Sequence, residues 1–163
     1  MTIKKEKTIK IAKYLFILYG IALFFILFLY GSRTGNQFHV RVFSKEHFEM
    51  PNLIPFRTIF SYLERAYHST ININIVLTNL LGNLLMFIPM GMALPVLFEK
   101  KFDKLWKTVL CVAVIVLFVE TIQFLTFRGS ADIDDLLLNT ISSAIGYGII
   151  KMKFVRKMLG LDE

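Results

Sequence analysis

Four segments of this 163-residue chain are apolar over a length that can cross a lipid bilayer. A membrane-spanning helix needs about 20 mostly apolar residues to cross a hydrocarbon core roughly 30 Å thick. Hydrophobic residues make up 55% of the sequence, and its mean hydropathy of +0.59 is too high for an ordinary soluble domain. We therefore predict an all-α, polytopic integral membrane protein that forms a single domain over residues 1–163. Its four transmembrane helices are predicted at 14–30, 73–98, 105–127 and 133–150.

The basic residues gather in three segments that four membrane crossings would bring to one side. These are the tail at 1–13, the connection around 100–107 and the stretch at 151–157, which hold 13 of the 19 Lys and Arg residues. Cytoplasmic loops are enriched in Lys and Arg. We therefore predict a multi-pass protein of the cell membrane with both termini in the cytoplasm and an uncleaved N-terminal anchor. Topology explains the net charge of +7, and no nucleic-acid partner is expected.

The long connection at 31–72 is predicted to lie outside the cell and to contain an amphipathic helix at 55–68. Apolar side chains recur there at helical spacing, and charged side chains occupy the other side, as at Arg57, Glu64 and Arg65. Such a helix lies on the outer leaflet or caps the bundle. Two roles stay open for it, which are to anchor the connection and to cover a ligand groove.

The second predicted transmembrane helix carries two amides on one face. Asn79 and Asn83 are four residues apart and therefore project from the same side. Gly82 permits close approach of another helix, and Pro89 is predicted to kink the chain because it lacks a backbone donor. Both interhelical hydrogen bonding and ligand binding would explain the two amides.

A second group of polar residues lies in the last two predicted helices. Glu120 and Gln123 share a face, and Asp132, Asp135 and Asn139 form a stripe on the next helix. An ionised carboxylate inside a bilayer costs about 2.5 to 3.5 kcal/mol on insertion scales, so Glu120 needs a partner. We expect that partner to be Arg128 or the amides of Asn79 and Asn83.

Asp134 is predicted to lie off this stripe. With Ser130 or Asp132 as the N-cap, its carboxylate would favour the positive end of the helix dipole. On this interpretation, the substitution Asp134→Asn should have almost no effect.

Several motifs, in order and at the expected spacing, resemble those of the VanZ-like family of small membrane proteins. The resemblance covers about residues 50–150, although Ser143, Ala144 and Met90 depart from the common pattern. It implies membrane location and the identity of the polar cluster. The founding member is associated with resistance to the glycopeptide antibiotic teicoplanin, and relatives occur in Gram-positive bacteria. The motifs are Asn52-Leu53-Ile54-Pro55-Phe56, Asn79-x-x-Gly82-Asn83-x-x-x-Phe87-Ile88-Pro89-x-Gly91, Glu120-x-x-Gln123 and Arg128-x-x-x-Asp132-x-x-Asp135-x-x-x-Asn139.

Three functions stay open from the sequence. The first is binding of a membrane lipid, a lipid-linked ligand or a lipopeptide near the outer leaflet, where Arg128 would suit an anionic head group. The second is an integral membrane enzyme for an envelope precursor, with Glu120 as general acid or base and Asp132 and Asp135 as its partners or as ligands for a hard cation. The third is a small transporter or proton relay. No cofactor and no His or Cys metal site are predicted, and the oligomeric state is undetermined. The candidate ligand-binding residues are Asn79, Asn83, Glu120, Gln123, Arg128, Asp132, Asp135 and Asn139.

Overall fold

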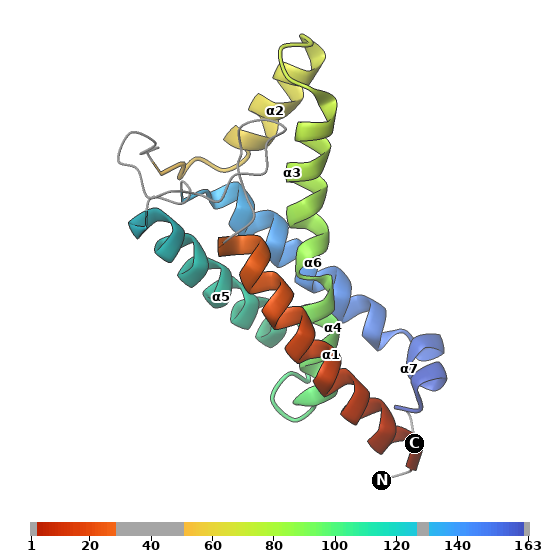
Figure 1. The fold of residues 1–163 in the computed structure, drawn as a ribbon. Helices are drawn as coiled ribbons and strands as arrows, with labels where there is room; N and C mark the ends of the chain where they lie inside the picture. Colours follow the sequence, from red (N-terminus) through yellow and green to blue (C-terminus); the bar gives the residue numbers. More distant parts are fainter. Residues whose placement is uncertain (1–2, 29–50, 127–130, 162–163) are drawn as a thin grey trace.

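Helices account for nearly all of the chain that the computed structural model describes, namely residues 3–28, 51–126 and 131–161. These ranges contain no β-strand, only one isolated bridge between Asn52 and Asp132. The predicted all-α class is therefore confirmed (Figure 1). The helices are α1 (Ile3–Phe28), α2 (Arg57–Tyr67), α3 (Ile73–Met86), α4 (Ile88–Leu97), α5 (Leu105–Leu125), α6 (Ile133–Lys151) and α7 (Lys153–Leu159).

Within the described residues, three helical stretches are long and apolar enough to cross a membrane. They are α1, the combined stretch α3–α4 over Ile73–Leu97, and α5. The predicted fourth span corresponds to α6, whose ability to cross the membrane on its own stays a prediction. This helix packs against α3, α4 and α5, and it buries polar residues such as Asn139, Ser142 and Ser143. Because its neighbours shelter those side chains, α6 needs less apolar surface than a helix surrounded by lipid.

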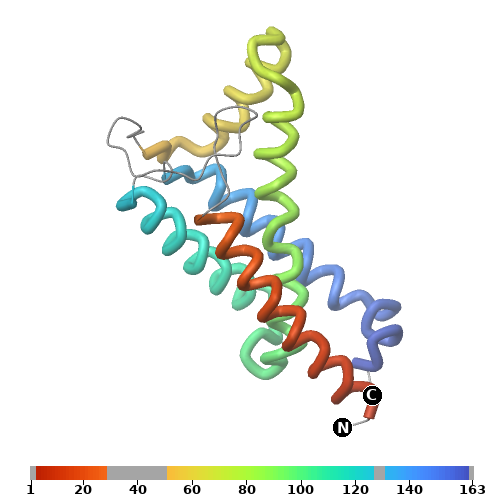
Figure 2. Tube along the Cα trace, in the orientation of Figure 1, coloured from red at the N-terminus to blue at the C-terminus, as the bar shows by residue number. Residues whose placement is uncertain are grey.

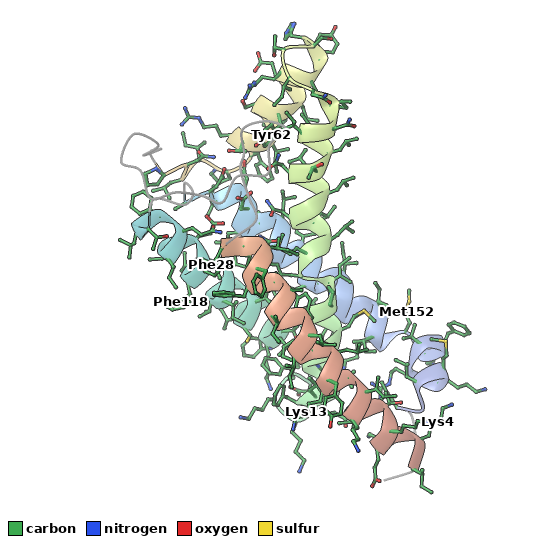
Figure 3. All side chains as sticks on the ribbon, viewed as in Figure 1. Lys4, Lys13, Phe28, Tyr62, Phe118 and Met152 are labelled. Carbon is green, nitrogen blue, oxygen red and sulfur yellow. The ribbon has the colours of Figure 1, made fainter. Side chains whose placement is uncertain are left out.

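Both ends of the described chain lie at the same end of the molecule (Figure 2). Lys5 and Arg156 both approach Glu99, at 3.3 Å and 4.0 Å, and Thr8 donates a hydrogen bond to the carbonyl oxygen of Leu159 at 2.7 Å. Lys4 and Lys13 lie toward this end as well (Figure 3). The three basic segments therefore meet, as predicted from the charge pattern. Their position on the cytoplasmic side stays a prediction.

The segment predicted as a basic tail at 1–13 is not a separate tail. Helix α1 already begins at Ile3 and runs without a break into the apolar segment. Lysine is a good helix former, and the contacts with Glu99 and Leu159 hold this first part of α1 against the rest of the protein. The membrane boundary predicted at residue 14 lies inside this helix and stays a prediction.

The second predicted transmembrane helix is broken at Phe87, two residues before Pro89. Pro89 has no N–H group to donate to the preceding turn, and the predicted kink is confirmed as a break between α3 and α4. Two neighbouring helices satisfy the backbone there. The Tyr19 hydroxyl donates to the carbonyl oxygen of Met86 at 3.0 Å, and the Phe87 N–H donates to the Ser142 hydroxyl oxygen at 3.0 Å.

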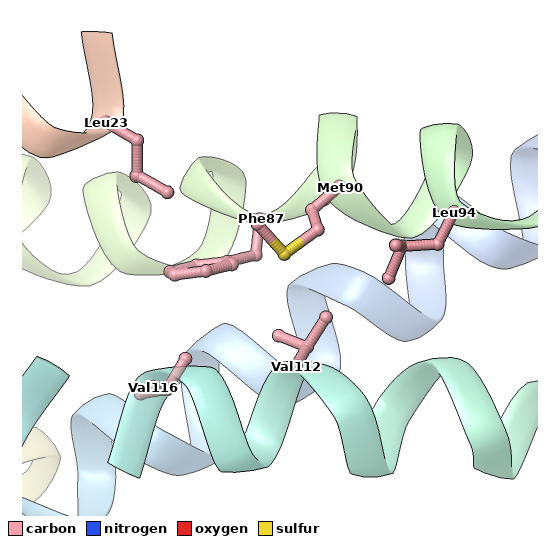
Figure 4. Packing of buried hydrophobic residues seen from close by; sticks show 6 residues of the cluster. All are labelled: Leu23, Phe87, Met90, Leu94, Val112 and Val116. Carbon is pink, nitrogen blue, oxygen red and sulfur yellow. The ribbon is translucent and has the colours of Figure 1, made fainter. Parts of the chain in front are cut away.

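The buried apolar core surrounds this break (Figure 4). It combines side chains from α1, α5 and the α3–α4 stretch, namely Leu23, Phe87, Met90, Leu94, Val112 and Val116. Gly91 in α4 and Gly146 in α6 allow these two helices to lie close together. A Cβ atom on Gly91 would lie 2.1 Å from the Ser143 carbonyl oxygen, and one on Gly146 would lie 2.2 Å from that of Ile88. Backbones approach this closely only where side chains are absent.

Candidate functional site

The start of α6 is the point where polar side chains from several helices meet, at the end of the bundle away from the termini (Figure 1). Asp132 is the N-cap of α6, and its side chain accepts a hydrogen bond from the Asp134 N–H at 2.9 Å. The predicted cap is therefore confirmed. Asp132, Asp134 and Asn139 are all buried, with at most 4% of each residue exposed. Such burial requires partners for the carboxylates.

Asp134 holds the beginning of α2. One carboxylate oxygen accepts from the Phe56 N–H at 2.5 Å, and the other accepts from the N–H groups of Thr58 and Ile59 at 2.8 Å and 3.2 Å. The N–H groups of a first helical turn have no partner within their own helix, so a carboxylate there is doubly favourable. We call this arrangement the Asp134 clasp. The expectation that Asp134→Asn has almost no effect conflicts with these contacts. That expectation considered only the position of Asp134 in α6, and the sequence did not show that α2 packs against it.

Asn52 and Thr58 complete the attachment of α2 to α6. The Asn52 backbone pairs with Ala131 and Ile133, at 2.8 Å and 2.9 Å, which forms the isolated bridge. The Asn52 amide and the Thr58 hydroxyl both donate to the Asp132 carboxylate, at 3.1 Å and 2.7 Å. The carboxylates of Asp132 and Asp134, at the start of α6, therefore hold the chain on both sides of residue 55.

Phe56 adopts a backbone conformation that is costly for its residue type. Its φ angle of 66° is left-handed, and a bulky residue pays about 1–3 kcal/mol in such sparsely populated conformations. The Asp134 clasp opposes this cost, because it binds the N–H group of Phe56 itself. The observed direction of α2 therefore depends on a strained backbone conformation at Phe56 that the hydrogen bond to Asp134 stabilises.

Asn79 and Asn83 lie on the face of α3 that turns toward α6, as their spacing predicted. The Asn83 side-chain amide donates to the Asp135 carboxylate at 2.5 Å. The Asn79 amide instead donates to the carbonyl oxygen of Ile75, one turn earlier in its own helix, at 2.7 Å. Of the predicted polar set, the structure therefore joins Asn83 with Asp135 directly.

A small pocket lies between α2, α3 and α6, next to the Asp134 clasp. The empty space in and around it amounts to about 230 Å³, and part of that space is open to the outside. We call it the α2 pocket. Three of the predicted ligand-binding residues, Asn79, Asn83 and Asp135, line it. The sequence did not indicate the contributions of α2. The full lining is Thr58, Ile59, Tyr62, Asn79, Leu80, Asn83, Asp134, Asp135 and Leu138.

Glu120 and Gln123 serve other contacts. The Glu120 carboxylate accepts from the Asp132 N–H at 3.4 Å, and Gln123 donates to the carbonyl oxygen of Leu27 in α1 at 2.7 Å. Glu120 therefore reaches the start of α6, whereas the amide of Asn83 is directed to Asp135 instead. Arg128, the other predicted partner, lies outside the described residues. Neither Glu120 nor Gln123 lines the α2 pocket.

Asn139 lies deeper in the bundle, and its side-chain oxygen has no hydrogen-bond partner among the described residues. Within the same ranges, no three side chains of His, Cys, Asp or Glu are grouped to hold a metal ion. The predicted polar stripe of α6 is thus divided. Asp132 caps the helix, Asp135 faces the pocket, and Asn139 is buried below them. Whether these residues bind a ligand stays a prediction.

The outer faces of α2 and α3 are apolar. On α2, Phe60, Leu63 and Tyr67 are at least half exposed, and none of the residues of this helix is fully buried. Its predicted amphipathic character is confirmed at 57–67. On α3, Ile73 and Leu77 are exposed apolar side chains as well. This surface suits the interface of a membrane.

A family model described as VanZ/LLP1 matches residues 16–155. The chain belongs to this family. The match runs from the middle of α1 to the first turn of α7, and so it includes the core, the break at Phe87 and every residue of the α2 pocket. This VanZ/LLP1 protein is therefore an all-α membrane protein, as the resemblance implied. No curated protein and no solved structure matched the chain.

Proposed function

We propose that this VanZ/LLP1 protein binds a lipid-linked or lipopeptide ligand at the outer face of the membrane and contributes to resistance to glycopeptide antibiotics of the teicoplanin type. The observation that carries the proposal is the α2 pocket, which combines polar groups with an open side. The pocket lies at the end of the bundle opposite the basic segments, which the charge rule assigns to the cytoplasm.

The ligand would divide between two surfaces. Its polar head group would enter the α2 pocket, where Asn79, Asn83 and Asp135 offer hydrogen bonds. Its acyl chain would lie on the exposed apolar side chains of α2, such as Phe60 and Leu63, of which 67% and 51% is exposed. An amphipathic ligand needs both surfaces, because its head and chain have opposite solvation requirements.

The geometry gives less support to an enzyme that uses Glu120 as general acid or base. A catalytic acid or base must lie within hydrogen-bond reach of its substrate. Glu120 does not line the α2 pocket, and its carboxylate accepts from the backbone of Asp132 instead. The same contact gives the buried carboxylate a structural reason to exist, which weakens the argument for a proton relay.

The test is the susceptibility of a strain that depends on this protein for resistance. Asn79→Leu removes a hydrogen-bonding group from the pocket at nearly constant volume and should lower resistance to a glycopeptide that carries an acyl chain. Asn74→Leu is the matched control, because Asn74 is an exposed residue of the same helix and does not line the pocket. Resistance that falls equally with both variants, or with neither, would contradict the proposal.

A further inference from the structure

Three side chains that line the α2 pocket already donate hydrogen bonds within the protein. The amide of Asn79 donates to the carbonyl oxygen of Ile75, and the amide of Asn83 donates to Asp135. The hydroxyl of Thr58 donates to Asp132. Because Ile75 presents a carbonyl and Asp135 a carboxylate, the two amides must present their NH₂ groups to these partners. Their carbonyl oxygens are thereby fixed as acceptors.

These two carbonyl oxygens are available to a ligand. Among the described residues, neither Oδ1 of Asn79 nor Oδ1 of Asn83 accepts a hydrogen bond. Both residues line the pocket together with Asp134 and Asp135, and none of the described lining residues is Lys, Arg or His. The described lining therefore offers several hydrogen-bond acceptors.

This chemistry selects a positively charged donor. A primary ammonium group carries three N–H donors on one compact charge. A trimethylammonium group has the same charge but no N–H donor, and a phosphate or carboxylate would bring further acceptors to a lining that already offers them. We propose that the α2 pocket binds the primary ammonium group of an amphipathic ligand. The proposal deepens the proposed function and rests on it.

Such an ammonium group has two sources at the outer face of a membrane. One is the head group of an aminophospholipid, and the other is the free amino group of a lipopeptide. The α2 pocket is small and open on one side, so only the ammonium end of the ligand would enter it. The remainder of the ligand would lie outside it, along the apolar surface of α2.

The experiment measures which lipids the full-length protein retains. Protein in nanodiscs that contain equal amounts of phosphatidylethanolamine, phosphatidylcholine and phosphatidylglycerol is transferred to detergent, and bound lipids are counted by native mass spectrometry. Loss of a charge-assisted hydrogen bond weakens binding by about tenfold. We therefore expect retention of phosphatidylethanolamine over phosphatidylcholine by about this factor if the lipid is the source. In a second arm, a lipopeptide with a free amine should bind about tenfold more tightly than its N-acetylated form if the lipopeptide is the source.

Two variants connect the preference to the pocket. Asn79→Leu removes one free acceptor and should abolish the preference, whereas Asn74→Leu should retain it. Leu138→Phe narrows the pocket without changing a polar side chain, and should reduce binding even if Asn79→Leu folds poorly. A preference in either arm that both pocket variants lose supports the proposal. Equal binding of amine and quaternary or acetylated ligands would overturn the ammonium proposal and leave the proposed function standing. Absence of any bound lipid or lipopeptide would overturn both.

Discussion

Replacing Asp134 by Asn should release the start of α2 from the bundle. The aspartate accepts three backbone hydrogen bonds through its two oxygens. An asparagine keeps only one of these oxygens and presents an NH₂ group where the other stood, so at least one bond is lost and the charge that strengthens the rest disappears. Hydrogen bonds to charged groups contribute about 1.5–3 kcal/mol each. The attachment of α2 should therefore weaken by about 2–4 kcal/mol.

The effect should be local. Helix α2 contains no buried residue, so its detachment exposes little apolar core. The α4–α6 contact and the core around Phe87 do not involve it. The midpoint of thermal unfolding in detergent should accordingly change little, while the local opening of residues 56–62 becomes much more frequent.

Hydrogen exchange of individual amides measures this opening directly. Because about 1.4 kcal/mol corresponds to a factor of ten, the amides of Phe56, Thr58 and Ile59 should exchange about 30-fold faster or more in Asp134→Asn. Amides in the middle of α5 should be unchanged. Asp103→Asn, at an exposed site in the connection between α4 and α5, provides the control and should leave α2 as protected as before. Unchanged exchange at Thr58 in Asp134→Asn would refute the clasp.

Three further predictions concern the bundle. In a denaturant titration, Gly91→Ala should lower the free energy of unfolding by about 3 kcal/mol, since overpacking a close contact costs about 1–3 kcal/mol or more. Gly148→Ala should be nearly neutral in the same titration, because a Cβ atom there meets nothing within 4 Å. Ser142→Ala should cost about 1–3 kcal/mol by leaving the buried Phe87 N–H without its acceptor, and Ser143→Ala should cost less because that hydroxyl bonds only within α6; equal losses would contradict this assignment. The hydrogen bond from Lys107 lowers the pKa of Asp103. This pair therefore stabilises the fold above the ordinary aspartate pKa, and the contribution is lost as the pH falls through the lowered pKa. Lys107→Met should raise the pKa of Asp103 in a carboxyl-carbon NMR titration, and an unchanged pKa would count against the pairing.

The helices could be predicted from the sequence because each depends on local information. The apolar segment predicted at 105–127 is α5 at Leu105–Leu125, and the one at 133–150 is α6 at Ile133–Lys151. The predicted break near Pro89 follows from a missing backbone donor, which is a property of one residue. Periodicity also gave the correct face of Asn79 and Asn83.

The partners of the polar residues could not be predicted in the same way. Periodicity identifies the face of a helix but not the segment that packs against it, and the Asp134 clasp joins residues 75 or more positions apart. The cost of a buried charge showed that Glu120 needs a partner, without showing that its carboxylate would accept from the Asp132 backbone. The same limit explains why Thr58, Ile59 and Tyr62 were missed, since only the direction of α2 places them at the pocket.

Photocrosslinking from the α2 pocket tests the central claim most directly. A photoreactive phenylalanine analogue at Tyr62, which lines the pocket, is compared with the same analogue at Phe118, which is 65% exposed on α5. After illumination in native membranes, the mass of each adduct identifies the crosslinked molecule. We predict that position 62 captures one amine-bearing amphipathic ligand far above its abundance in the membrane, and that position 118 captures lipids in proportion to the bulk composition. Identical adducts in identical proportions at the two positions would contradict a ligand site beneath α2.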